Sequence, residues 1–150
     1  MVTGAGDTDV EDKSRRFDVE LFVIHPTIDP SAVSSALALE PSQAHRVGDP
    51  RVTPKGTALP GSYRDTRWRF SARYEVKSQY FAAEVQKFVD RLANSREFLH
   101  HLRATGGRTC LVLQFLGDGY FGDVIQRNTL AQLVDLHLDL GIECYADSQR

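Results

Sequence analysis

The chain has 150 residues and a formal net charge of -2, with 41% hydrophobic and 25% charged residues. These values are typical of one globular domain, and such a nearly neutral chain has no general attraction for nucleic acid or an anionic membrane. No apolar run approaches the roughly 20 residues that cross a bilayer, and the N-terminus lacks the apolar stretch of a signal peptide. We therefore expect a cytoplasmic protein without membrane contact, in which Cys110 and Cys144 are buried free thiols.

The N-terminal part of the chain predicts a tail, a strand and a short helix. Residues 1–15 are small, polar and acidic, which is typical of a disordered tail. Strict alternation of apolar and polar residues predicts a strand over residues 17–25. Asp29 followed by Pro30 is typical of a helix start, and we expect this helix to end near Pro41.

Residues 41–62 hold four of the six prolines and three glycines. This composition predicts a long loop, and loops of such length inside a compact domain tend to be functional or mobile. A second strand is expected over residues 67–76, because apolar residues that include Trp68 alternate there with arginines.

The middle of the chain predicts two helices and a third strand. An apolar period of about 3.6 residues runs from residue 78 to Gly106. We expect this helical segment to break in two at Asn94–Ser95. The more continuous apolar run at residues 110–116 predicts a strand that is buried in the sheet.

The stretch GDGYFGD at residues 117–123 contains a literal G-x-G-x-x-G pattern. A phosphate-binding loop needs a helix that starts at the loop itself, whereas here four residues separate it from the expected helix cap, Asn128. We therefore interpret the stretch as a turn. The leucine-rich helix that follows is expected to stop at Gly141, and residues 142–147 predict the last strand.

The order of these elements predicts an α+β fold in which residues 16–150 form a single domain. Two β-α-β units joined by an extra helix suggest a ferredoxin-like two-layer sandwich. Counting the four strands along the chain, we predict a mainly antiparallel sheet of order 4-1-3-2. The first and third strands would then be central, and the arginine-rich second strand would lie at an edge.

Common catalytic and cofactor motifs are missing from the sequence. No two of the five histidines have helical i, i+4 spacing, and no C-x-x-C or G-x-S-x-G motif occurs. We therefore expect no catalytic residue, no metal and no cofactor, and favour a non-enzymatic function while leaving catalysis open.

The basic segment is the most informative feature. Seven arginines or lysines lie between Arg46 and Arg73, against two acids, and Tyr63 and Trp68 interleave with them. One interpretation is a salt-bridged sheet, in which the acids of the first strand, Asp18 and Glu20, pair with Arg69 and Arg73. A second is a binding surface for an acidic protein or a small anion. Nucleic acid is the weakest candidate, because an RNA-reading sheet needs aromatic residues on its open face.

Several short motifs resemble the bacterial proteins grouped as domain of unknown function family 4279. An Arg-x-Gly-Asp follows a short helix, a Trp opens a strand about 20 residues later, and the final strand contains a Tyr. The matching positions are Pro41, Arg46, Gly48, Asp49, Trp68 and Tyr145, and the resemblance covers residues 17–147. It implies no assigned activity, although some small cytoplasmic bacterial proteins of this kind look like immunity or interaction proteins.

We therefore predict a non-enzymatic, immunity-like or other interaction domain that contacts an unidentified protein through the loop at residues 43–67, as a monomer or a homodimer. The alternative is a small anionic-ligand binder or enzyme with a pocket near Arg46, Asp49 and Tyr145. The candidate contact residues are Arg46, Asp49, Arg51, Arg64, Arg67 and Tyr145.

Overall fold

The computed structural model describes residues 16–75, 80–117 and 119–145. The tail predicted at residues 1–15 lies outside the described residues. In the described part, a five-stranded mixed sheet has the order β2-β5-β1-β6-β7. Its strands are β1 (Arg16–His25), β2 (Gln43–His45), β5 (Thr66–Glu75), β6 (Arg108–Leu116) and β7 (Asp139–Tyr145). β1 is antiparallel to both β5 and β6, and β7 is parallel to β6.

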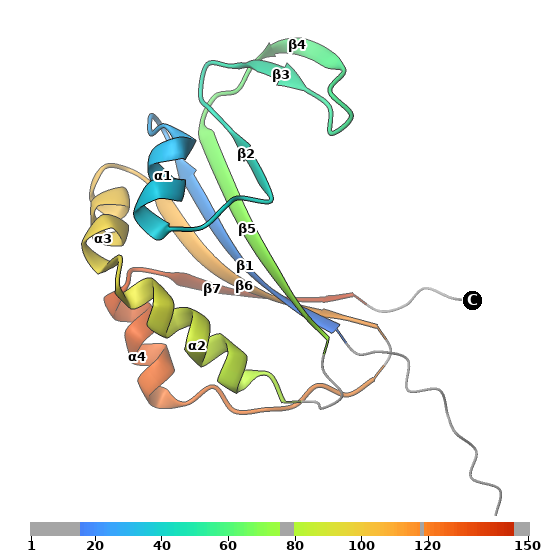
Figure 1. The fold of residues 1–150 in the computed structure, drawn as a ribbon, viewed down its shortest axis with the longest axis vertical. Coiled ribbons are helices and arrows are strands. Elements are labelled where there is room, and N and C mark those ends of the chain that lie inside the picture. The colour runs from blue at the N-terminus through green and yellow to red at the C-terminus, as the bar shows by residue number, and fades with distance from the viewer. Residues whose placement is uncertain (1–15, 76–79, 118, 146–150) are drawn as a thin grey trace, which may run out of the picture.

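Four helices lie on one side of this sheet, as Figure 1 shows. They are α1 (Pro30–Leu37), α2 (Ala82–Ala93), α3 (Arg96–Ala104) and α4 (Arg127–Asp135). The expected cap at Asp29 is confirmed, because its carboxylate accepts the backbone N–H of Ser31 at 2.9 Å. The expected break between α2 and α3 at residues 94–95 is confirmed as well.

The hydrophobic core fills the space between the helices and one face of the sheet. Alternate residues of β1 from Phe17 to Val23 are fully buried and face the helices. Trp68 is also buried, and its indole N–H donates to Ser34 Oγ at 3.0 Å. Strand alternation therefore identified the inner face of the sheet correctly.

A separate two-stranded sheet, β3 (Pro50–Val52) with β4 (Ala58–Ser62), forms a hairpin beyond one end of the main sheet (Figure 1). Together with β2, this hairpin occupies the segment for which we predicted a long loop. That prediction is wrong, because short backbone ladders order the segment despite its prolines and glycines.

The predicted ferredoxin-like sandwich with sheet order 4-1-3-2 is also wrong. β5, the second expected strand, returns antiparallel beside β1, so the chain forms no parallel crossover there. β7 pairs in parallel with β6, the third expected strand, and not with β1. The first and third expected strands, β1 and β6, are central neighbours, as predicted. We expected β5 at an edge of the sheet, but β2 pairs with part of β5 and forms the edge there.

The boundaries of the last helix and strand differ from their prediction. α4 begins at Arg127, so Asn128 lies inside the helix and does not cap it. After α4 the chain turns at His137, whose φ of 58° is left-handed, and β7 then runs through Gly141. Of the two free thiols, Cys144 is exposed and Cys110 is half-buried, so the expectation of two buried thiols is wrong.

The glycine-rich stretch ends in a helix cap. One Asp123 carboxylate oxygen accepts the backbone N–H groups of Phe81 and Ala82, at 3.0 and 2.8 Å, at the start of α2. These backbone hydrogen bonds hold the pKa of Asp123 below its ordinary value. The helix that Asp123 caps precedes the stretch, and the helix that follows the stretch, α4, begins only at Arg127. Gly117 and Gly119 have positive φ values of 95° and 148°, which supports the interpretation of the stretch as a turn.

We predict that Asp123→Ala lowers the free energy of unfolding by about 1 kcal/mol, the usual effect of removing a cap. The matched control is Asn128→Ala, which removes the expected but unused cap and should leave stability unchanged or slightly raised. Because the pKa of Asp123 is lowered by folding, the difference between wild type and Asp123→Ala should be full above about pH 4 and shrink below it. Urea unfolding at several pH values measures it, and equal stability of both variants would contradict the capping role.

Candidate binding surface

Three arginines of the basic segment, Arg51, Arg64 and Arg67, lie at the end of the main sheet that carries the hairpin. There the hairpin, β2 and the start of β5 line an open pocket of about 440 Å³. We call the residues that line it the basic surface: His45, Arg51, Ser62, Tyr63, Arg64, Asp65 and Arg67.

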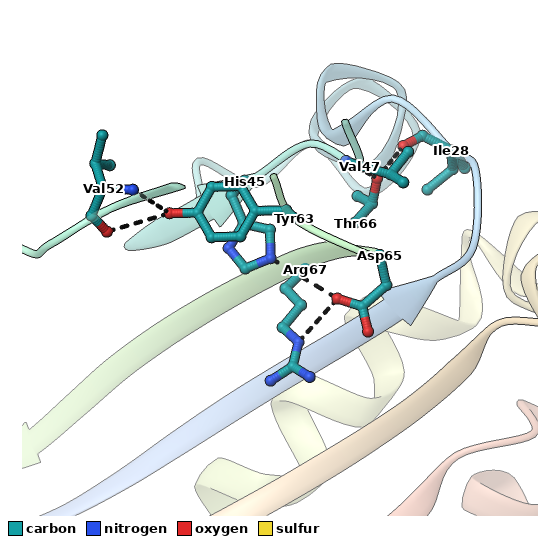
Figure 2. Close-up of polar contacts among 8 residues, drawn as sticks. All are labelled: Ile28, His45, Val47, Val52, Tyr63, Asp65, Thr66 and Arg67. Carbon is teal, nitrogen blue, oxygen red and sulfur yellow. Dashed lines mark hydrogen bonds and ion pairs between the residues drawn. The ribbon is translucent and has the colours of Figure 1, made fainter. Parts of the chain in front are cut away.

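Thr66 fixes the main sheet to the segment that leads into the hairpin. Its side chain is fully buried, and its hydroxyl donates to the Ile28 carbonyl at 2.6 Å and accepts the Val47 N–H at 3.1 Å (Figure 2). One hydroxyl therefore joins the first residue of β5, the connection before α1 and the chain after β2.

Tyr63 holds the hairpin in place. Its hydroxyl lies 3.2 Å from the backbone nitrogen and 3.3 Å from the carbonyl oxygen of Val52 (Figure 2). Its own backbone bonds to Gly48 and Asp49, and Gly48 has a positive φ of 86°, which favours glycine. The ring of Tyr63 stacks on His45, with 3.7 Å between ring centroids and 5° between planes.

His45 and Arg67 converge on one carboxylate. Arg67 donates through Nε to Asp65 Oδ1 at 3.1 Å, and His45 Nε2 lies 3.8 Å from the same oxygen (Figure 2). Burial, followed by the charge of Arg67, lowers the pKa of His45 below its ordinary value, although Asp65 acts in the opposite direction. His45 is therefore neutral at neutral pH.

The basic surface has more cations than anions. Three arginines, Arg51, Arg64 and Arg67, are among the residues that line the pocket, together with one acid, Asp65. Neither Arg51 nor Arg64 forms an ion pair with any residue that the structure describes. Subtracting one carboxylate from three guanidinium groups leaves two positive charges.

A model of the family described as "Domain of unknown function (DUF4279)" matches residues 15–147. The chain belongs to this family. The resemblance drawn from Arg46, Gly48, Asp49 and Trp68 is thus confirmed for the DUF4279 domain. No match was found among curated proteins or among solved structures.

The DUF4279 domain does not bring all the predicted site residues together. Arg51, Arg64 and Arg67 share the pocket, whereas Arg46 reaches Asp29 at the start of α1, with 3.5 Å between Nη1 and Oδ2. Asp49 holds the turn before the hairpin through its backbone N–H and carbonyl groups.

Tyr145 lies at the opposite end of the sheet. Strand register places it beside Leu116 and Arg16, whereas Thr66 pairs with His25 at the far end of β1. The ten residues of β1 separate these ends by roughly 30 Å, at about 3.3 Å per residue. A single pocket near Arg46, Asp49 and Tyr145 is therefore not formed.

The other arginines of β5 stabilise the sheet. Arg73 forms two hydrogen bonds to the carboxylate of Asp18, at 2.8 and 3.0 Å. Arg69 pairs with Glu20 at 3.6 Å and lies over the ring of Phe22. Burial raises the pKa of Glu20, while Arg69 opposes this rise. The predicted pairing of β1 acids with β5 arginines is confirmed.

The described residues lack two other kinds of feature. They contain no group of three or more histidines, cysteines or acids that could hold a metal ion. No described helix has the length and apolar character needed to span a membrane.

We predict that Thr66→Val lowers the free energy of unfolding by about 1 kcal/mol or more, because it leaves the Val47 N–H and the Ile28 carbonyl without their partner. The shape of the side chain is nearly unchanged, so packing contributes little. Hydrogen exchange at the Val47 amide should accelerate. Thr57→Val, at an exposed hairpin position, is the control and should change stability by less than about 0.5 kcal/mol. If both substitutions had the same effect, Thr66 would not have the joining role.

Proposed function

We propose that this DUF4279 domain is a non-enzymatic binding module that contacts an acidic surface of a partner protein through its basic surface. The observation that carries the proposal is the pair Arg51 and Arg64, which have no anionic partner among the described residues and lie on an ordered hairpin. A desolvated guanidinium needs an anion opposite it, and arginines are enriched at protein interfaces.

The hairpin has further properties of a contact surface. Val52 and Leu59 are 46% and 38% exposed, so apolar side chains are available beside the arginines. Protein interfaces combine an apolar centre with charged groups at the rim. Because Tyr63 already holds the hairpin in place, a partner would bind without first having to order it, which favours affinity.

Competing functions receive less support from the same residues. The open face of the main sheet carries the ion pairs Asp18–Arg73 and Glu20–Arg69, where an RNA-binding sheet needs aromatic residues for stacking. A binding module that covers a partner suits an immunity-like protein. The two free thiols are compatible with the reducing cytoplasm, where we propose that the domain acts.

Charge reversal tests this proposal. We expect the double variant Arg51→Glu, Arg64→Glu to bind its partner at least about tenfold more weakly, because like charges then face each other across the interface. The matched control, Lys87→Glu with Arg127→Glu, makes the same change of charge on α2 and α4. Tagged wild type and both variants are recovered from the native host, and partners are quantified by mass spectrometry and then by titration.

The proposal predicts at least one protein that wild type and the control retain, and that the hairpin variant loses. Its binding should weaken as salt concentration rises. A set of retained proteins that is the same for all three forms would contradict the proposal.

A further inference from the structure

We propose that the pocket of the basic surface holds a doubly charged oxyanion of the sulfate or phosphate-ester class, and that His45 takes up a proton when this anion binds. The inference rests on the proposed function, because the pocket lies at the centre of the surface proposed to meet a partner.

The charge of the pocket matches a dianion. Arg51 extends from β3, Arg64 from the connection after β4, and Arg67 from β5, so the guanidinium groups come from three separate segments. Asp65 neutralises one of these charges. A carboxylate would balance one of the two charges that remain, whereas a dianion balances both. A tetrahedral oxyanion also offers acceptor oxygens in several directions, which suits donors from different segments.

His45 is positioned to respond to that anion. Its side chain is 23% exposed, lines the same pocket, and has its ring plane fixed by the stack on Tyr63. The charged groups around it are Asp65 and Arg67 of the β5 region, Asp49 before the hairpin, and the pocket arginines Arg51 and Arg64. The Asp65 oxygen nearest the His45 ring also accepts a hydrogen bond from Arg67. His45 therefore shares this carboxylate with Arg67.

Anion binding changes this balance of charge. Without the anion, burial and Arg67 keep the pKa of His45 low and the ring neutral. A dianion in the pocket adds negative charge beside the ring and favours the imidazolium form, which then offers a further N–H donor. Affinity should therefore rise as the pH falls, by up to about tenfold per pH unit between the anion-bound pKa and the lower pKa of free His45. Above the first of these values and below the second, affinity should not change with pH.

Sulfate is the probe of choice, because it stays a dianion across this pH range and any bound proton must come to the protein. The pKa of His45 is measured by NMR in sodium sulfate and in sodium chloride at equal ionic strength. We expect sulfate to raise the measured pKa by about one pH unit, the lower end of the effect of a neighbouring opposite charge. An equal His45 pKa in both salts, or the absence of sulfate-dependent shifts at the pocket near pH 6, would overturn the inference.

Substitutions separate the two parts of the inference. His45→Phe keeps an aromatic ring against Tyr63 but cannot take up a proton, so sulfate should bind with no pH dependence. His45→Gln serves as a second form without a titrating ring. Arg51→Ala with Arg64→Ala should abolish sulfate binding, while His101→Asn, at an exposed helix position, should behave as wild type. Unchanged pH dependence in both His45 variants would assign the proton to another group and refute the role of His45.

The source of the anion is tested with phosphoserine and with a phosphoserine peptide. A peptide that binds at least about tenfold more tightly than the free amino acid identifies a phosphorylated partner protein, and equal affinities identify a small phosphate ester. Failure of this inference is distinguishable from failure of the proposed function. A partner that depends on Arg51 and Arg64 without any sulfate response refutes only the anion site, and sulfate binding without such a partner refutes only the protein contact.

Discussion

The antiparallel pairing of β1 with β5 decides which arginines of this domain are available for binding. β1 carries both of its internal acids, Asp18 and Glu20, in its first half, where they neutralise Arg73 and Arg69 of β5. Toward the start of β5, the β1 residue opposite Arg67 is Ile24, which supplies no charge. Asp65 is the one acid among the residues that line the pocket, which include three arginines. The surplus of positive charge at the hairpin end of the sheet is therefore a consequence of strand register.

Local signals predicted the elements well but not their arrangement. Asp29–Pro30 and Asn94–Ser95 act on the backbone next to them, so a helix start and a helix break could be recognised from the sequence. The return of β5 beside β1 is a ladder between residues more than 40 positions apart, which no local signal indicates. Residues 43–62, whose proline and glycine content indicated a loop, form short ladders in between. The number of basic residues in the sequence indicated this segment as the candidate site. The stack of His45 on Tyr63 could not be predicted, because it joins residues 18 positions apart and no periodic sequence pattern indicates such a contact. Tyr145 was grouped with the loop because a shared family motif carries no information about which end of a sheet a residue occupies.

The hairpin is an unusual place for a fixed structure, because an isolated two-stranded hairpin is only marginally stable in water. All residues of β3 and β4 are exposed, so burial of apolar surface contributes little to their order. What remains is the backbone ladder of the hairpin and a short chain of side-chain contacts, in which Tyr63 joins the hairpin to its base and Thr66 joins that base to the main sheet. Two hydroxyl groups, one of them fully buried, thus connect the proposed contact surface to the sheet.

These contacts link the charge of His45 to the order of the hairpin. Tyr63 bonds to Val52 through its hydroxyl and stacks on His45 through its ring. Because both contacts use the side chain of Tyr63, a change in the His45 stack also affects the bond to Val52. A protonated imidazole attracts the face of an aromatic ring more strongly than a neutral one does. An anion that brings a proton to His45 would therefore also strengthen the contact that holds the hairpin. Thermodynamic linkage requires the converse, namely that whatever orders the hairpin, including a partner protein seated on it, raises the affinity of the pocket for the anion.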